Sequence, residues 1–358
     1  MKHGMKKRSI ALLLSGVLAL GLLGGCGSEG GQQAEGSTPP ADESAPQTQL
    51  EKIVITEPAR GFLWAPIYLA QTLGYFEEEG LTAEFQTVTG GDPGAVVFSG
   101  EAQFGLRGVE MPLSATQAGQ GCKILASTTA TYPYILMGAS EEFSTVESLR
   151  GQVVAGSTPS GSLTAWVNAC LAYGGLDPET DVEMVMIQGN GQIAAMANGE
   201  IAACCGNSSW AVKQEIENGA VPIIDGTDPE VFKEIMGSET YEMYILFASD
   251  EYIASNPETC QKVVNGVVKA MNWMKTASAE EITEGLMPLF EGREEEVLYC
   301  VQDAQETNLY SYTGYHTESG YDAALKLAKL CGLIEEDIPA ETIYDESFLD
   351  NAWAEIGQ

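Results

Sequence analysis

The chain has 358 residues, of which 44% are hydrophobic and 19% charged. This balance excludes general disorder, and the length predicts about two domains. Seventeen basic and 51 acidic residues give a formal net charge of −34, which argues against binding to nucleic acid or to anionic lipid because a negative surface repels phosphate groups. The two histidines of the chain disfavour a His-rich metal site or a His-based catalytic triad. We expect no catalytic residue, no metal site and no cofactor.

Residues 1–26 predict a secretion signal, with a basic start and an apolar run over 10–23 that is short for a membrane span. The sequence Leu23-Gly24-Gly25-Cys26 resembles the lipobox of bacterial lipoproteins, which implies that Cys26 becomes the lipidated first residue. The alternative is a cleaved signal in which this cysteine is incidental. Residues 27–49 are rich in Gly, Ser, Gln, Pro and acid and predict a flexible tether. We therefore expect a lipid-anchored protein on the extracytoplasmic face of the cell membrane, without deciding between cell surface and periplasm.

Strand and helix signals alternate through the middle of the chain. The first block has strands at 52–55, 81–88, 102–106, 123–129 and 135–138, with helices at 64–72, 94–99 and 111–117. The second block has strands at 152–155, 182–187 and 201–204, with helices at 161–173, 192–198 and 209–218. A last strand at 241–249 precedes a helical tail, in which the methionines at helical spacing indicate core packing.

This alternation predicts an α/β fold built from two doubly wound lobes with parallel sheets. We expect lobe I to be discontinuous, over 51–141 and 241–358, because the tail has few strands of its own. Lobe II is expected over 142–240. The arrangement predicts a hinge and a ligand cleft between the lobes.

Removing Cys26 leaves seven cysteines scattered through apolar patterns, with no CxxC and no zinc-ligand spacing. An odd number cannot all pair. Buried free thiols are the favoured interpretation, and a disulfide that uses Cys204 or Cys205 stays open.

Four segments resemble solute-binding proteins of ABC importers, in the group that includes alkanesulfonate, taurine, nitrate and thiamine-pyrimidine-precursor binders. They are LGYFEEEGL at 73–81, GEAQFG at 100–105, SLRGQVVA at 148–155 and NGEIAA at 198–203. The similarity covers about residues 50–280. It implies a type II periplasmic-binding-protein fold whose lobes close on a small molecule. Many members continue the last segment with a Glu-Pro pair, whereas this chain has Cys205-Gly206-Asn207-Ser208, so the solute cannot be carried over from the family.

Ligands of such sheets bind at the carboxyl ends of the strands, which selects the candidate site residues of lobe I. Here Arg107 could bind an anion or form a surface salt bridge, Arg60 could be a solvated loop charge, and Trp64 could anchor the core. Asp92 is interpreted mainly as a helix cap. The candidates are Arg60, Phe62, Trp64, Gly90, Gly91 and Arg107.

In lobe II, the segment 157–162 is the strongest candidate. A Ser/Thr/Gly segment that leads into a helix presents N–H groups, hydroxyls and the positive end of the helix dipole. Simple capping by Ser160 or Ser162 is the alternative. Tyr132 and Tyr134 lie near the crossover between lobes and could pack at the hinge. The candidates are Ser157, Thr158, Ser160, Gly161, Ser162, Asn207 and Trp210.

These residues predict binding without chemistry: a monomer that captures a small solute, an organic anion or a heterocycle, and delivers it to an ABC permease. Nitrate fits less well because it is too small to need three aromatic side chains. One alternative is a ligand-sensing lipoprotein that partners a sensor or adhesion system. An enzyme on the same fold is a weaker alternative, since no Ser-His-Asp order is present and His316 lies far beyond the strand ends.

Overall fold

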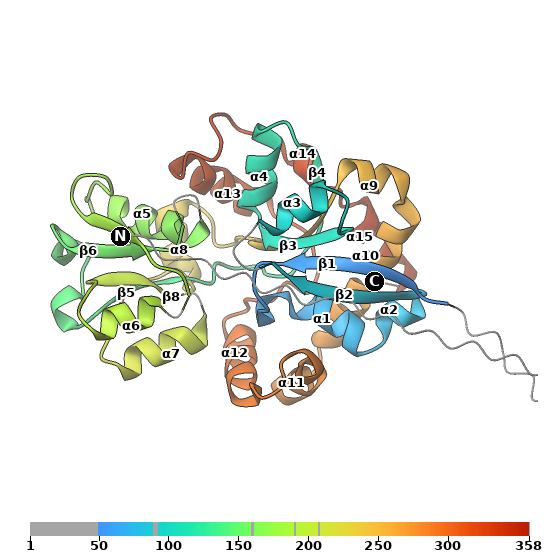
Figure 1. Cartoon of the computed structure of the whole chain (residues 1–358), viewed down its shortest axis with the longest axis horizontal. Helices are drawn as coiled ribbons and strands as arrows, with labels where there is room; N and C mark the ends of the chain where they lie inside the picture. Colours follow the sequence, from blue (N-terminus) through green and yellow to red (C-terminus); the bar gives the residue numbers. More distant parts are fainter. Residues whose placement is uncertain (1–48, 89–91, 159–160, 190, 207, 358) are drawn as a thin grey trace, which may run out of the picture. The chain divides into compact units, whose positions relative to one another are not determined.

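The computed structural model describes residues 49–88, 92–158, 161–189, 191–206 and 208–357. Within these residues the strands form two five-stranded sheets (Figure 1). The first sheet, in the order β2-β1-β3-β10-β4, contains β1 (Glu51–Glu57), β2 (Leu81–Thr87), β3 (Phe104–Gly108), β4 (Cys122–Ser127) and β10 (Tyr244–Ser249). The second, in the order β7-β6-β8-β5-β9, contains β5 (Ile135–Gly138), β6 (Val153–Gly156), β7 (Glu183–Met186), β8 (Ala203–Gly206) and β9 (Val221–Asp225).

Both sheets are mixed, because each contains one antiparallel strand besides the parallel strands that the sequence predicted. β1 runs parallel to β2 and β3, but β10 is antiparallel to β3 and β4. In the second sheet β6 is parallel to β7 and β8, and β5 is antiparallel to β8 and β9. The antiparallel strand of each sheet is the first one formed after the chain crosses over from the other sheet. These strands are β5, which follows β4, and β10, which follows β9.

The position of β5 also corrects the expected boundary after residue 141. β5 pairs with β8 and β9, so the chain has already crossed to the second sheet before Ile135. The return crossing leads to β10, as the sequence suggested for the segment from 241 onward. The physical reason is that strand pairing, and not the end of an alternating block, decides which sheet a strand joins.

Helices α1 to α4 belong to the first block and α5 to α8 to the second, and short 3-10 helices (η) occur beside them. In chain order the helices are η1 (Phe62–Trp64), α1 (Ala65–Thr72), α2 (Tyr75–Glu78), α3 (Pro93–Phe98), α4 (Glu110–Gln117), η2 (Glu141–Phe143), η3 (Glu147–Leu149), α5 (Ser162–Tyr173), α6 (Gly191–Ala197), α7 (Ser209–Glu217) and α8 (Pro229–Met236). The C-terminal helices are α9 (Asp250–Ser255), α10 (Pro257–Met274), α11 (Ala279–Leu286), η4 (Met287–Leu289), α12 (Glu294–Glu306), α13 (Glu318–Leu330), α14 (Ala340–Ile343) and α15 (Ser347–Glu355).

The longest of these, α10, confirms the apolar helical face predicted for the tail. It packs against α1 and α15, and its side chains on that face are buried. Met271 and Met274 lie in this core, so they are packing residues as expected. Burying each such side chain contributes about 2 kcal/mol to folding.

An aromatic cluster joins the two crossing segments. Tyr132 stacks on Phe232 with ring centroids 4.6 Å apart and meets Tyr241 edge-on at 5.0 Å. Because Tyr132 is buried between them, it packs the connection between the sheets, which is the hinge-packing alternative of the sequence analysis. The cluster also includes Trp166 of α5.

The seven cysteines outside the signal segment are free thiols in the described residues. Six are buried and Cys331 is half-buried. Burial raises the pKa of Cys122 and of Cys260 to about 12, which keeps these thiols protonated and unreactive.

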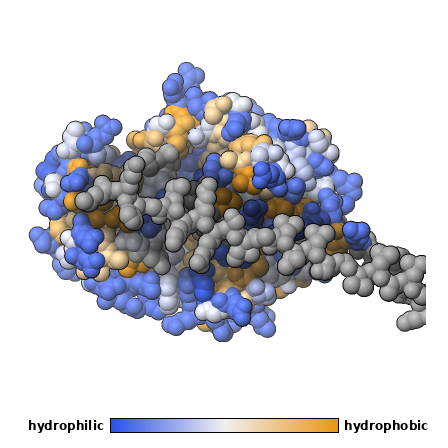
Figure 2. All heavy atoms as spheres, viewed as in Figure 1, coloured by the Kyte–Doolittle hydropathy of each residue, from blue (hydrophilic) through white to orange (hydrophobic). Residues whose placement is uncertain are grey.

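The surface of the described residues follows the acidic composition. Where grey atoms do not cover it, hydrophilic side chains dominate the face shown in Figure 2, with smaller apolar areas between them. None of the described helices has the length and apolar character needed to cross a bilayer.

Candidate binding cleft

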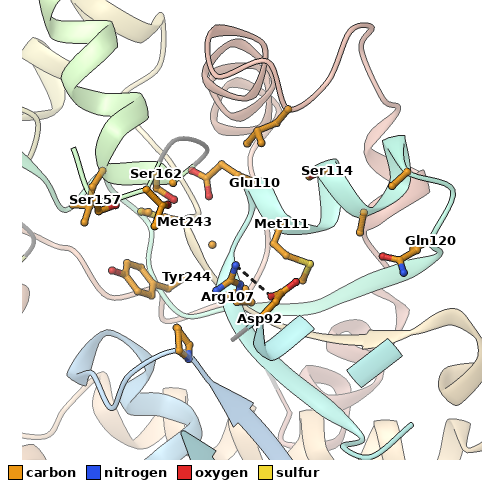
Figure 3. A pocket seen from close by; sticks show the side chains of 18 of the residues that line it. Asp92, Arg107, Glu110, Met111, Ser114, Gln120, Ser157, Ser162, Met243 and Tyr244 are labelled. Atoms are coloured by element: carbon orange, nitrogen blue, oxygen red, sulfur yellow. Dashed lines mark ion pairs between the residues drawn. The ribbon is translucent and has the colours of Figure 1, made fainter. Parts of the chain in front are cut away.

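A cleft of about 510 Å³ lies where the carboxyl ends of first-sheet strands meet the start of α5 from the second sheet (Figure 3). β3 and its following helix α4 form one wall, and the segment after β6 forms the opposite wall. Its lining residues are Pro58, Trp64, Asp92, Phe98, Arg107, Gly108, Glu110, Met111, Ser114, Ala115, Ala118, Gln120, Tyr134, Ser157, Thr158, Gly161, Ser162, Leu163, Met243, Tyr244 and Leu333. The volume suits a small organic molecule.

An aromatic wall is built from Trp64, Tyr244 and Tyr134. The rings of Trp64 and Tyr244 meet edge to face, with centroids 4.8 Å apart. The Tyr134 and Tyr244 hydroxyls are hydrogen-bonded at 3.2 Å. Trp64 is only 4% exposed, and its indole Nε1 has no hydrogen-bond partner among the described residues. Trp64 thus combines the core role and the cleft role that the sequence offered as alternatives.

Arg107 at the end of β3 brings a positive charge to the cleft. Its Nη2 lies 3.6 Å from Asp92 Oδ1, a loose ion pair that Figure 3 shows within the cleft wall. Its Nε is buried and has no partner in the described part of the chain. Asp92 also caps α3, since its Oδ1 accepts a 2.9 Å hydrogen bond from the Gly94 N–H, as the sequence indicated. A weak pair of this kind leaves the guanidinium able to bind a solute.

Glu110, at the start of α4, is a buried acid in the same wall and was not among the sequence candidates. It is 4% exposed, and its Oε1 accepts a 2.7 Å hydrogen bond from the Tyr241 hydroxyl. Its Oε2 has no hydrogen-bond partner among the described residues. Burial raises the pKa of Glu110, against smaller lowering effects from Tyr241, Ser162 and Arg107. A wall with an uncommitted carboxyl oxygen can recognise a polar group.

Ser157 and Thr158 are hydrogen-bonded to Thr164 of α5. The Thr164 hydroxyl donates to the Thr158 carbonyl at 2.6 Å and accepts from the Ser157 N–H at 3.0 Å. Gly161 is the N-cap of α5 and provides no side-chain cap. Ser162 therefore does not act as the cap, and its hydroxyl faces the cleft beside Glu110 (Figure 3). Among the described residues no side chain caps the start of this helix, which favours an acceptor group there.

Six of the residues predicted from sequence line the cleft together: Trp64, Arg107, Ser157, Thr158, Gly161 and Ser162. Five predicted positions, Cys26, Gly90, Gly91, Ser160 and Asn207, lie outside the described residues. Three others do not line the cleft: Arg60, Phe62 and Trp210.

Arg60 is turned toward a buried acid instead. Its Nε donates a 2.8 Å hydrogen bond to Glu57 Oε1, and its guanidinium lies over the rings of Tyr68 and Phe85. The Glu57 carboxylate also accepts from the Tyr68 hydroxyl. Arg60 therefore neutralises the buried end of β1.

Phe62 packs in the core of the first sheet, where it is buried. Trp210 of α7 packs instead against Tyr299 of α12, with ring centroids 5.9 Å apart. Lys213 lies over both rings, 4.5 Å and 4.8 Å from their centroids. Trp210 thus joins a helix of the second sheet to the C-terminal helices, away from the cleft lining.

Sequence reasoning missed several lining residues because they follow no motif. Tyr244 and Met243 come from the return crossing into β10, and Met111 and Ser114 from α4. The sequence contains one signal that points to Glu110, because this residue starts the helix that directly follows the strand of Arg107. The described residues contain no group of three or more His, Cys, Asp or Glu side chains that could hold a metal ion.

Comparisons with known proteins agree with this architecture. The putative binding protein YtlA of Bacillus subtilis strain 168 is 24% identical over 279 residues, which is 75% of this chain and 78% of the relative. The periplasmic sulfonate-binding protein SsuA of Methylobacillus flagellatus KT superposes with a TM-score of 0.62 at 16% identity, covering 86% of this chain and 95% of that one. The desulfurization enzyme DszB superposes with a TM-score of 0.59 at 16% identity, covering 86% and 99%.

These likenesses show the periplasmic-binding-protein fold, on which both binding proteins and an enzyme are built. The family model described as NMT1/THI5 like matches residues 62–280, which span β3, β10 and the whole second sheet. The matched region contains all four segments that carried the resemblance in the sequence. The chain therefore belongs to the NMT1/THI5-like family.

Proposed function

We propose that the protein is the extracytoplasmic solute-binding component of an ABC importer, which captures a small organic anion or heterocycle. One observation carries this proposal: the cleft is lined from both sheets by groups that a solute can satisfy. Arg107 and Trp64 supply one wall, and Ser157 and Ser162 the other. The family and the fold support the same function.

The lining supports the class of solute. The guanidinium of Arg107, the hydroxyls of 157–162 and the start of α5 favour an acceptor-rich or anionic group. Trp64, Tyr244 and Met243 offer apolar faces to an attached ring or chain. An organic sulfonate, a carboxylate or a pyrimidine-like heterocycle satisfies both halves. Nitrate would use the polar half alone.

The mechanism is binding by closure. The two sheets are the cores of two lobes, the first completed by β10 and the C-terminal helices and the second beginning at β5. A solute that touches both walls stabilises the closed arrangement, because only that arrangement provides both sets of contacts. A permease then recognises the closed form. A micromolar affinity corresponds to about 8 kcal/mol of binding free energy.

The same proposal places the protein on the outer face of the membrane through a lipid on Cys26, with residues 27–49 as a tether. Labelling of the wild-type protein by a radioactive fatty acid, lost in the Cys26→Ala variant, supports the anchor. Equal labelling of both forms contradicts it.

Two other functions use the same fold. A sensing lipoprotein would bind its solute in the same way, and adjacent permease and ATPase genes would favour import over sensing. The desulfurization enzyme among the structural neighbours makes an enzyme the second candidate. Incubation of the purified protein with its bound solute, followed by mass spectrometry, separates the candidates, since a binding protein returns the solute unchanged.

The experiment that tests the proposed function is a thermal-shift screen over sulfonates, aromatic carboxylates and vitamin precursors. A ligand that binds only the folded state raises the melting temperature. At a concentration of a hundred times Kd it adds about 2.7 kcal/mol to the free energy of unfolding. At least one compound in these classes is expected to stabilise the protein in a saturable manner. A flat result across all three classes overturns the proposal.

A further inference from the structure

Three buried polar atoms in the cleft wall have no hydrogen-bond partner among the described residues. They are Trp64 Nε1, Arg107 Nε and Glu110 Oε2. The first two are N–H donors that can never accept. Leaving a buried polar group unpaired costs about 1–3 kcal/mol. Three such atoms around one cleft indicate that a bound molecule supplies the missing partners.

The Glu110 carboxyl is fixed so that its two oxygens differ. Oε1 accepts the Tyr241 hydroxyl at 2.7 Å, which gives this oxygen the acceptor role. The Ser162 hydroxyl lies close to Oε2, since a Cβ on Gly108 would meet both atoms, and it lowers the pKa of the Glu110 carboxyl. Oε2 nevertheless has no hydrogen-bond partner of good geometry among the described residues. A solute atom that displaces the Ser162 hydroxyl from this position takes the place beside Oε2. If the carboxyl carries a proton, the proton resides on Oε2 and points to the solute.

The charged and titratable groups around Glu110 favour the protonated carboxyl. Arg107 on β3 is the cation that faces it, and its effect on the Glu110 carboxyl is small beside that of burial. The other titratable groups that interact with Glu110 are Tyr241, Tyr132, Tyr244, Tyr344 and Cys331. Burial raises the pKa of every one of these five, so they are neutral near pH 7 and give Glu110 no further countercharge.

We propose that Glu110 is a specificity-determining residue, which donates a hydrogen bond from Oε2 to the solute and selects a head group that only accepts hydrogen bonds, such as a carboxylate or a sulfonate. The proposal rests on the proposed function and deepens it. Trp64 Nε1, Arg107 Nε and the protonated Glu110 then form a set of three donors. The start of α5 and the Ser157 hydroxyl lie on the opposite wall, so both walls favour the same kind of group.

Two consequences distinguish this arrangement from an ordinary arginine–anion site. The Trp64 N–H, the Arg107 N–H and the protonated Glu110 offer no acceptor to the two N–H groups of a carboxamide, and an ammonium group is repelled by Arg107, so both bind more weakly than an anion. The capture of an anion also requires the proton on Glu110. Above the pKa of that carboxyl, binding takes up one proton, and the affinity falls by up to tenfold for each unit of pH.

The test compares four ligands with one ring and different head groups: benzoate, benzenesulfonate, benzamide and benzylamine. Calorimetry gives Kd for the wild type, for Glu110→Gln and for Glu215→Gln between about pH 5.5 and 8.5, a range in which both anions stay fully charged. The side-chain amide introduced by Glu110→Gln keeps an acceptor for Tyr241 and places a permanent donor where Oε2–H was. Glu215 is a matched control, because it is also buried with an unpartnered Oε2 but lies outside the cleft lining.

The expected result is that an anion binds at least tenfold more tightly than benzamide or benzylamine, and that its affinity falls with pH in the wild type and in Glu215→Gln. Glu110→Gln is expected to bind within about threefold of the wild type at low pH and to lose the pH dependence. Titrations of the wild type in two buffers of different ionisation enthalpy should show proton uptake on binding. This measurement keeps the proposal testable even if Glu110→Gln does not fold.

An affinity that rises with pH, a preference for benzamide or benzylamine, or an unchanged pH dependence in Glu110→Gln overturns the role of Glu110. Each of these outcomes still shows a binding protein and leaves the proposed function in place. Failure of all four ligands, together with a flat thermal-shift screen, overturns the proposed function and this inference with it. If none of the four ligands binds, but a wider screen finds an amine or a neutral heterocycle that does, the inference about Glu110 is overturned and the proposed function stands.

Discussion

The Tyr241 hydroxyl donates a 2.7 Å hydrogen bond to Glu110 Oε1, and this bond joins the return crossing to the helix that follows β3. It holds a buried acid in the cleft wall with one oxygen hydrogen-bonded and the other without a hydrogen-bond partner of good geometry among the described residues. Gly108, at the end of β3, makes room for the arrangement, since a Cβ at this position would clash with Glu110 Oε2. The main polar feature of the cleft therefore depends on contacts between segments that are far apart in the sequence.

The first prediction concerns the two arginines at strand ends. Arg107→Ala should weaken the binding of an anionic solute by at least tenfold, because it removes the cation and the unpartnered Nε from the cleft. Arg60→Ala should leave the affinity unchanged and lower the stability by about 2 kcal/mol, because Glu57 loses its countercharge while the Tyr68 and Thr87 hydroxyls stay in place. Calorimetry and urea unfolding measure the two effects. Equal loss of affinity in both variants would contradict this division of roles.

The second prediction separates the two tryptophans by their indole N–H groups. Trp64→Phe keeps an aromatic face in the cleft and removes Nε1–H, so we expect a three- to tenfold loss of affinity, about 0.5–1.5 kcal/mol. Trp210→Phe should leave the affinity within twofold, because Trp210 contacts Tyr299 and Lys213 and does not line the cleft. Kd values from calorimetry provide the comparison. A larger effect of Trp210→Phe than of Trp64→Phe would contradict these roles of the two side chains.

The third prediction tests the hydrogen bonds that position Ser157 and Thr158. Thr164→Val removes the hydroxyl that bonds Thr158 and Ser157, so we expect a loss of about 1–3 kcal/mol in stability together with weaker binding. Thr283→Val is the matched control, because the buried Thr283 hydroxyl has no partner in the described residues. Its removal should be neutral or slightly stabilising. Urea unfolding of both variants checks the contrast, and similar losses would contradict it.

The fourth prediction follows from the two carboxyls whose pKa burial raises to about 7, Glu215 and Glu242. In the folded state each holds a proton at pH values where the unfolded chain has lost it. The folded state therefore binds more protons between about pH 4.5 and 7, and stability falls as pH rises through this window. Across this window each residue can lower the free energy of unfolding by roughly 3 kcal/mol.

Glu215→Gln should remove the contribution of that residue to the slope, since glutamine does not titrate. The free energy of unfolding, measured in urea at several pH values, is expected to vary less in the variant than in the wild type. A variant whose stability falls as steeply as that of the wild type would show that Glu215 ionises freely in the folded protein.

The sequence was sufficient to predict the α/β fold, the order of most elements and six cleft residues. These features depend on local periodicity and on the rule that ligands lie at strand ends. The directions of β5 and β10 could not be predicted, because an alternating pattern is the same for parallel and antiparallel neighbours. For this reason the sequence predicts a boundary after 141, although β5 belongs to the second sheet.

The two arginines show the same limit at the level of the site. Arg60 and Arg107 both follow strands, and nothing local tells them apart. Glu57 distinguishes the two arginines, because its buried carboxylate at the end of β1 forms an ion pair with Arg60. Glu110 shows the reverse case: a glutamate at a helix start is usually a solvated residue, and only the packing of Tyr241 and the C-terminal helices buries it.

The most direct test of the account is a crystal structure of the protein with the tightest ligand from the thermal-shift screen. We predict that its acceptor group lies between Arg107 and the start of α5, within hydrogen-bond distance of Trp64 Nε1, Arg107 Nε and Glu110 Oε2, with the body of the molecule against Tyr244. Electron density for the ligand anywhere else, or a cleft filled by the protein's own side chains while the ligand is bound, would contradict it.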